Sequence, residues 1–115
     1  MAIQILTQEI IIRIIVIAPQ KGRLDAFEAP ALRKACDKYL EQGVYHFVFD
    51  LSQITMLDSA GLAVLVSVLK RARLKDGDVR LIFPMAEEAN RVLKLTKFDQ
   101  VFKSIDISQI VPKGF

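Results

Sequence analysis

Two short apolar runs, separated by a segment with helical spacing, constrain the fold of this chain most. "VYHFVFDLS" (residues 44–52) and "VRLIF" (residues 79–83) are rich in β-branched and aromatic residues, which is typical of strands buried on both faces of a sheet. The spacing of apolar residues predicts a helix between them, over residues 60–74. Because strand–helix–strand units favour parallel pairing with right-handed crossovers, the sequence predicts an α/β domain built on parallel strands.

The N-terminal residues predict a β-hairpin. Residues 3–6 and 10–17 are rich in β-branched residues and flank the polar trio Thr7-Gln8-Glu9, a pattern that indicates two strands joined by a turn. The hairpin adds an antiparallel strand at the edge of the sheet. Since residues 10–17 would lie at or near that edge, weak self-association through strand pairing stays open.

The other segments complete an alternating order of strands and helices. "QKGRLDAFEAP" (residues 20–30) is expected to be a loop that leads into a first helix, with Pro30 in its first turn and Gly43 at its C-terminal stop. Residues 87–98 predict a third helix, and residues 101–105 a last strand followed by one more turn. The order β-β-α-β-α-β-α-β predicts one domain over residues 1–115, with a mixed, mostly parallel sheet and helices packed on it.

Composition and charge exclude several classes of protein. The chain is 52% hydrophobic and 25% charged, which is too apolar for disorder. Cys36 is the only cysteine, so an internal disulfide is impossible. The net charge is only +3, and the basic residues after position 69 suit the C-terminal end of a helix, so direct binding of nucleic acid is not expected. The most apolar run, residues 10–19, is too short to cross a bilayer and contains Arg13. A cytoplasmic protein that does not insert into membranes is expected.

Ser59, at the start of the second predicted helix, has three interpretations: nucleophile, helix cap and switch. A nucleophile needs a nearby base, and the only imidazole is that of His46. "LDSAG" also lacks the G-x-S-x-G turn that exposes a nucleophilic serine. Phosphate-binding loops and metal-ligand clusters are missing as well, so no enzymatic activity, cofactor or metal is expected. Capping remains open, because Ser59 is a preferred N-cap residue and the charge of Asp58 suits the same helix end.

The helix after Ser59 is apolar on more than one side. Leu62, Leu65, Val66 and Leu69 follow the spacing of a face that packs on a sheet, which leaves Ala63, Val64 and Val68 on other faces. Either a neighbouring helix covers that flank or a partner protein does. A phosphate on Ser59 would add about −1.5 to −2 charges, which a helix N-terminus tolerates but an apolar partner surface does not.

The segment "FDLSQITMLDSAGLAVLVSVLKRAR" resembles the core signature of STAS domains, in particular of bacterial anti-sigma factor antagonists. "GRLDAFEAPALRKA" and "VRLIFPMAEEANRVLKLTKFDQVFKSIDI" are similar to other parts of that family, so the resemblance covers nearly the whole chain. It implies the STAS fold and a non-enzymatic role. Many members have Ser or Thr directly after the phosphorylated serine, where this chain has Ala60, so Ser59 is the single hydroxyl at the helix start.

The resemblance also implies a partner switch. The unphosphorylated form would bind an anti-sigma factor with serine kinase activity and release the sigma factor. Phosphorylation of Ser59 would disrupt that binding, and a PP2C-type phosphatase would reverse it. The implied docking surface comprises Asp25, Asp58, Ser59, Ala60, Gly61, Leu62, Ala63 and Val64. The alternative is a STAS subunit of a transporter ATPase or of a larger signalling assembly, which would bind its partner without being phosphorylated.

Overall fold

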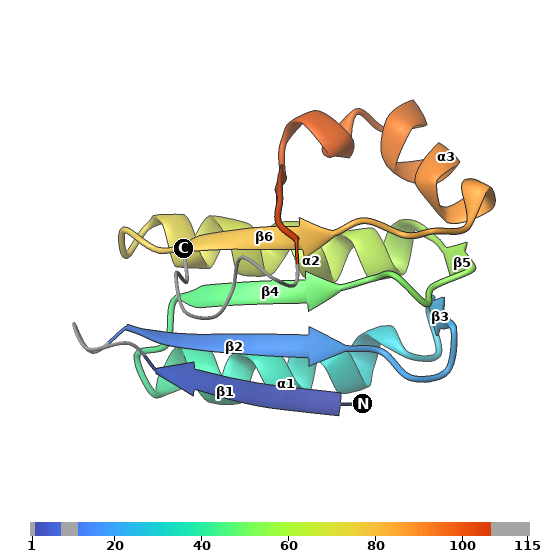
Figure 1. The fold of residues 1–115 in the computed structure, drawn as a ribbon. Helices are drawn as coiled ribbons and strands as arrows, with labels where there is room; N and C mark the ends of the chain where they lie inside the picture. The colour runs from blue at the N-terminus through green and yellow to red at the C-terminus, as the bar shows by residue number, and fades with distance from the viewer. Residues whose placement is uncertain (1, 8–11, 107–115) are drawn as a thin grey trace.

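A five-stranded mixed sheet forms the centre of the molecule (Figure 1). The computed structural model describes residues 2–7 and 12–106. The strands lie in the order β1-β2-β4-β6-β7, with β1 antiparallel to β2 and every other neighbouring pair parallel. Their bounds are β1 Ala2–Thr7, β2 Arg13–Ala18, β4 His46–Asp50, β6 Asp78–Ile82 and β7 Lys103–Ser104. This arrangement confirms the predicted α/β fold with an antiparallel strand at its edge.

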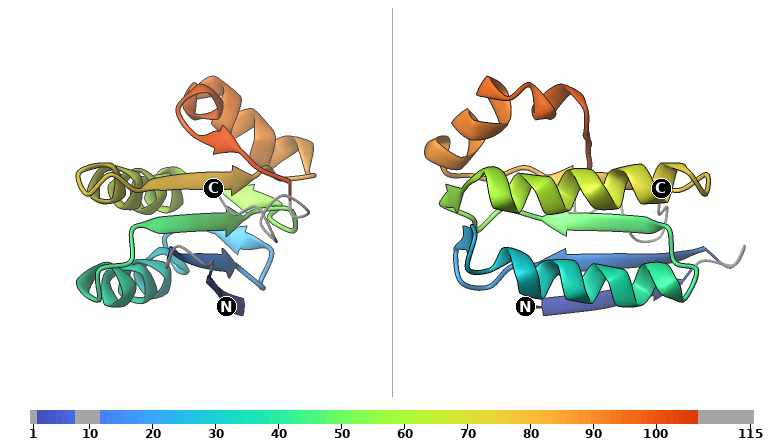
Figure 2. Two further views of the ribbon diagram at one scale, coloured as in Figure 1. Left: turned by 60° about the vertical axis from the view of Figure 1, so that its left-hand side comes forward. Right: turned by 180° about the vertical axis from the view of Figure 1, so that it is seen from behind.

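Two helices cover one face of this sheet, and a third element lies beyond its edge (Figure 2). Helices α1 (Ala29–Glu41) and α2 (Ser59–Arg73) lie side by side on the same face. Helix α3 (Glu87–Leu95) and the 3₁₀ turn η1 (Phe98–Gln100) lie beyond β6, and the chain then returns to pair β7 with β6. Within residues 2–7 and 12–106, no helix is long and apolar enough to span a bilayer.

The alternation of side chains along β4 divides the core into two parts. Phe47 and Phe49 point toward the helices, where their rings stack with centroids 6.2 Å apart in the main cluster. Val48 points the other way and packs in a smaller cluster with Ile14 and Ile105. Because β4 is buried on both faces, its continuous apolar sequence is what its central place in the sheet requires.

Both ends of α1 follow the sequence signals. Pro30 lies in the first turn, where its missing N–H removes no helical hydrogen bond. After the helix, Gly43 has a φ of +82°, a left-handed conformation that glycine adopts without strain. Its N–H donates to the carbonyl of Leu40, and the N–H of Val44 donates to that of Tyr39, which closes the helix as a Schellman motif.

Several boundaries differ from the predictions. Residues 20–30 were expected to be a loop that leads into the first helix, but they contain β3 (Arg23–Leu24), which pairs in parallel with β5 (Met56–Leu57) in a separate two-stranded sheet. Helix α3 ends at Leu95 rather than at residue 98, because Lys97 turns the chain with a φ of +61°. The last strand is shorter than predicted. The position of β2, one strand in from the sheet edge, agrees with the prediction that this segment lies at or near that edge. Residues 10–11, predicted to begin the second strand, lie outside the described residues. So does the turn expected after residue 105, apart from residue 106.

The buried thiol of Cys36 yields a prediction about reactivity. Burial in the core raises its pKa to about 12, so the folded protein holds the thiol neutral and unreactive. We expect a disulfide reagent such as DTNB to label the native protein at pH 8 far more slowly than the urea-unfolded protein.

Since the pKa of the Cys36 thiol is higher in the folded state than in the unfolded state, its stabilising contribution should decline as pH rises from about 9 toward 12. Comparing the urea unfolding of wild type and Cys36→Ala at pH 8 and at pH 10 isolates the contribution of this thiol to stability. Rapid labelling of the native protein would contradict the prediction that the thiol is protected.

Candidate functional site

The pairing of β3 with β5 brings two loops together at the start of α2. Asp25 directly follows β3, and Asp58 directly follows β5. One carboxylate oxygen of Asp58, Oδ2, accepts a hydrogen bond of 3.1 Å from the backbone N–H of Ala26. The N–H of Asp58 donates back to the carbonyl of Leu24 at 3.3 Å. Two segments more than 30 residues apart in sequence therefore form one surface.

Asp58, and not Ser59, is the N-cap of α2. Its backbone is extended (φ −124°, ψ −178°), and its Oδ1 accepts the N–H of Gly61 at 3.0 Å, which is the geometry of a capping side chain. Of the interpretations left open for Ser59, the structure excludes the helix cap, since Ser59 is the first helical residue of α2. Its side chain is exposed, and within the described part of the chain its hydroxyl has no hydrogen-bond partner.

Gly61 lets the first turn of α2 touch the backbone of β3. A Cβ at this position would lie 2.3 Å from the carbonyl oxygen of Leu24, far inside van der Waals contact. A glycine is needed here for the close approach and not for an unusual φ. Gly61 itself is buried, so it positions the surface without forming part of it.

Asp25 anchors the loop between β3 and α1. Its Oδ2 accepts hydrogen bonds from the Arg23 guanidinium, including one of 2.6 Å from Nε, while Oδ1 accepts the N–H groups of Phe27 and Glu28. The hydrogen bonds from Arg23, followed by those from the backbone, lower the pKa of the Asp25 carboxyl. Only 4% of Asp25 is exposed, so this residue shapes the loop and offers a partner little surface of its own.

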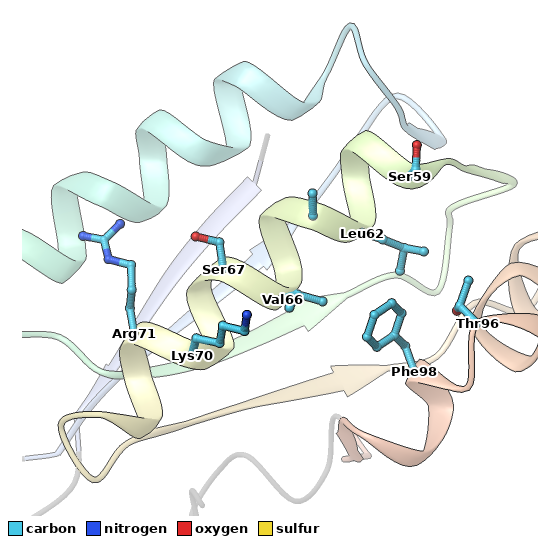
Figure 3. Close-up of a pocket in the computed structure, with 9 residues that line it drawn as sticks. Ser59, Leu62, Val66, Ser67, Lys70, Arg71, Thr96 and Phe98 are labelled. Carbon is cyan, nitrogen blue, oxygen red and sulfur yellow. The ribbon is translucent and has the colours of Figure 1, made fainter.

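A hollow of about 590 Å³ lies along the outer side of α2, between that helix and the segment of α3 and η1 (Figure 3). Ser59 stands at its one end, above Leu62, and Lys70 and Arg71 stand at the other. The hollow is lined by Ser59, Leu62, Ala63, Val66, Ser67, Lys70, Arg71, Thr96 and Phe98.

The structure separates the predicted docking residues of α2 into two groups. Ala63 is exposed and Ala60 is half-exposed, while Leu62 is 4% exposed and borders the hollow. Val64 is only 1% exposed, so its assignment to a docking surface is wrong in this structure. Val64 and Val68 both pack in the main core, whereas Val66, expected on the face that packs on the sheet, is half-buried and lines the hollow. Helix α1 packs on α2, and Arg71, two turns after Val64 on the same side of α2, pairs with Asp37 of α1. A neighbouring helix therefore covers that flank, which is the first of the two alternatives that the sequence left open.

Sequence reasoning did not find the far wall of the hollow. Thr96 and Phe98 come from the C-terminal part of the chain, more than 30 residues from Ser59. Their only sequence signal is an aromatic residue at the end of a predicted helix, which is too common to indicate a site. On the near wall, Arg71 pairs with Asp37 of α1 at 2.5 Å, and Arg73, which lies outside the hollow, pairs with Asp78 at 3.3 Å. Much of the basic cluster therefore serves contacts within the molecule.

These features define a small α/β domain that presents an exposed serine beside an apolar hollow, at a point where two loops are fastened together. Among the described residues, no three histidine, cysteine or acidic side chains are grouped to hold a metal ion.

Comparison with known proteins then assigns the family: the chain belongs to the STAS domain family, whose model matches residues 6–111. A relative from Thermotoga maritima, provisionally named an anti-sigma factor antagonist, is 31% identical over 94 residues, which is 81% of each chain. The anti-sigma-B factor antagonist of Listeria monocytogenes is 25% identical over 83 residues, or 71% of each chain. Among solved structures, unphosphorylated SpoIIAA of Bacillus superimposes with a TM-score of 0.76 over 96% of this chain and 93% of that chain. Its sequence identity is only 15%, so this likeness concerns the fold.

Removing the carboxylate of Asp58 should loosen this site. We expect Asp58→Ala to lower the free energy of unfolding by about 1–2 kcal/mol, because the cap of α2 and the bond to Ala26 are both lost. Asp58→Asn keeps one capping oxygen and should lose less. Urea unfolding measures both variants, and Asp50→Asn is the matched control. Among the described residues, the Asp50 carboxylate accepts one hydrogen bond, from the N–H of Ser52 two residues on. Equal stability of Asp58→Ala and wild type would contradict the capping role.

Proposed function

We propose that this protein is an anti-sigma factor antagonist that works as a phosphorylation-controlled partner switch. In its unphosphorylated form it binds an anti-sigma factor with serine kinase activity and so releases the sigma factor. Phosphorylation of Ser59 ends the binding, and a PP2C-type phosphatase restores it. Such a protein acts in the cytoplasm. The observation that carries the proposal is the exposed Ser59 hydroxyl at the end of an apolar hollow. This hydroxyl does not cap α2, because Asp58 does.

The electrostatics of the helix start are compatible with a phosphate. The positive end of the helix dipole and the backbone N–H groups of the first turn favour an anion at Ser59. The neighbouring Asp58 carboxylate opposes it, but both of its oxygens already accept backbone N–H groups, which offset part of its charge. Ser59 is also the first residue of α2 and buries nothing in the core. Modification should therefore leave the fold intact while changing the surface.

The relatives support this role. The Listeria protein is named as an antagonist of an anti-sigma factor. SpoIIAA has been solved in an unphosphorylated and in a phosphorylated form, and both share the fold of this chain, with TM-scores of 0.76 and 0.69. A fold that accepts a phosphate in SpoIIAA supports the same chemistry here.

The proposed docking surface is narrower than the one expected from the sequence. Ser59, Ala60 and Ala63 supply its accessible atoms, and Leu62 borders them. Asp25, Asp58 and Gly61 hold the two loops and the helix start in place beneath it.

The test is binding to the candidate anti-sigma kinases of the source organism, with wild type, Ser59→Ala and Ser59→Asp compared by calorimetry. We expect Ser59→Ala to bind like wild type and Ser59→Asp to bind more weakly, with both variants as stable as wild type. Incubation with kinase and ATP should add one phosphate to wild type and none to Ser59→Ala. If the partner binds all three proteins equally and no phosphate is added, the proposal fails, and a constitutively bound STAS subunit becomes the better explanation.

A further inference from the structure

The hollow beside Ser59 has apolar walls that are held in place from both sides. Leu62 and Val66 of α2 face Phe98 of η1 across it (Figure 3). The Phe98 ring packs edge-to-face on Phe102, with centroids 6.3 Å apart. Thr96 also lines the wall, but its hydroxyl bonds to the carbonyls of Val92 and Leu93, 2.7 and 3.2 Å away. A molecule in the hollow would therefore meet mainly carbon surface.

The two ends of the hollow differ in charge. At the end away from Ser59 lie Lys70 and Arg71. Arg71 is paired with Asp37 of α1, whereas Lys70 is exposed and has no ion pair within the described residues. At the other end, Ser59 is neutral until it is phosphorylated. An occupant that carries a carboxylate beside Lys70 and apolar side chains toward Ser59 would match this distribution.

The dimensions favour a segment of a protein over a small molecule. Ser59 and Lys70 are eleven residues apart on α2, which corresponds to about 16 Å along a helix axis, or three turns. The hollow opens to solvent along that length, so a small ligand would stay largely exposed, while tight ligand sites bury most of their ligand. An amphipathic helix laid in a groove buries one face and leaves the other in water.

We infer that the hollow between α2 and η1 receives an apolar segment of the kinase partner, with an acidic residue of that segment beside Lys70. This inference rests on the proposed function and adds the direction of approach: the partner reaches Ser59 along the outer side of α2. A phosphate on Ser59 would then stand at the apolar end of the bound segment. At that end the phosphate would be desolvated by the bound segment. It would form no ion pair with Lys70, because Lys70 lies at the opposite end of the hollow.

Substitutions on exposed helix positions test the hollow without touching the core. Ala63→Trp should fill it, and we expect at least about 30-fold weaker binding of the partner, as for a blocked interface centre. Ala63→Lys is a second variant with good helix propensity and should weaken binding as well. The matched control is Ala31→Trp, at an exposed alanine beside a separate hollow along α1. We expect it to bind within about 2-fold of wild type, and thermal unfolding should confirm that all three variants are folded.

Lys70→Glu tests the charge. We expect about 10-fold weaker binding at low salt, with a smaller difference at high salt, because screening weakens the repulsion. Lys34→Glu, at an exposed position on α1, controls for the change in net charge and should bind like wild type.

The outcomes separate this inference from the proposed function. If Ser59→Asp loses affinity while the Ala63 variants and Lys70→Glu bind like wild type, the partner does not use the hollow, and the inference is overturned although the switch stands. If the Ala63 variants lose affinity but Lys70→Glu does not, the apolar segment stands and its acidic residue is refuted. If wild type binds no candidate kinase and Ser59 accepts no phosphate, the proposed function and this inference fail together.

Discussion

Phosphorylated at Ser59, the protein is expected to bind its kinase partner several hundred-fold more weakly than in its unmodified form. A dianion at the end of the hollow must be desolvated when an apolar partner surface covers it, and a loss of about 3–4 kcal/mol of binding free energy corresponds to that factor. The thermal unfolding temperature should change little, because the phosphate lies at a helix N-terminus and displaces no core contact. The switch would thus act on binding and spare the fold.

The measurement uses protein with phosphoserine installed at position 59, titrated against the kinase partner by calorimetry. Ser59→Asp carries less charge than phosphoserine and should give a smaller loss. Ser52→Asp is the matched control, since Ser52 lies in the loop after β4 and outside the hollow. Binding of the phosphorylated protein within about 3-fold of the unmodified one would refute the switch.

Replacing Gly61 by alanine is expected to destabilise the protein by about 2–3 kcal/mol, in the range of an overpacked site. In most helix positions the same change stabilises by about 0.5–1 kcal/mol, because glycine has the lower helix propensity. Here the added Cβ would meet the carbonyl oxygen of Leu24 at 2.3 Å, and backbone atoms cannot move aside as a flexible side chain can. The sign of the effect therefore distinguishes close approach from propensity.

Urea unfolding of Gly61→Ala gives this sign directly. Ala63→Gly is the matched control, two residues further on the same helix and exposed, and it should lose about 1 kcal/mol through propensity alone. Because the start of α2 rests on β3, Gly61→Ala should also weaken partner binding even though Gly61 is buried. A more stable Gly61→Ala variant would show that the helix start and β3 are not tightly packed.

The order of the main strands and helices was predictable because each has a local signal. The apolar run that contains β4 and the glycine that ends α1 act within a few residues of their own position. The pair of β3 and β5 had no such signal. Each strand has two residues, too few to show an alternation, and the pairing joins segments that lie 33 residues apart.

The choice of cap shows the limit of local reasoning within the site itself. Asp58 and Ser59 are adjacent, and both residue types cap helices well. What decides between them is the second contact of Asp58, the hydrogen bond from Ala26 in another loop, together with the packing of the helix start on Leu24. With Asp58 as the cap, the exposed hydroxyl of Ser59 has no capping role.

The sequence by itself determined the α/β fold, the family and the serine at the start of an apolar helix, because hydrophobic period and motif residues are properties of neighbouring positions. Only the tertiary structure decided which side of that helix is accessible. Helix α1 covers Val64, and η1 brings Phe98 opposite Leu62. Burial depends on what the distant parts of the chain place against a helix face. Because α2 carries apolar residues on more than one side before Lys70, its own spacing does not decide which of those sides stays open.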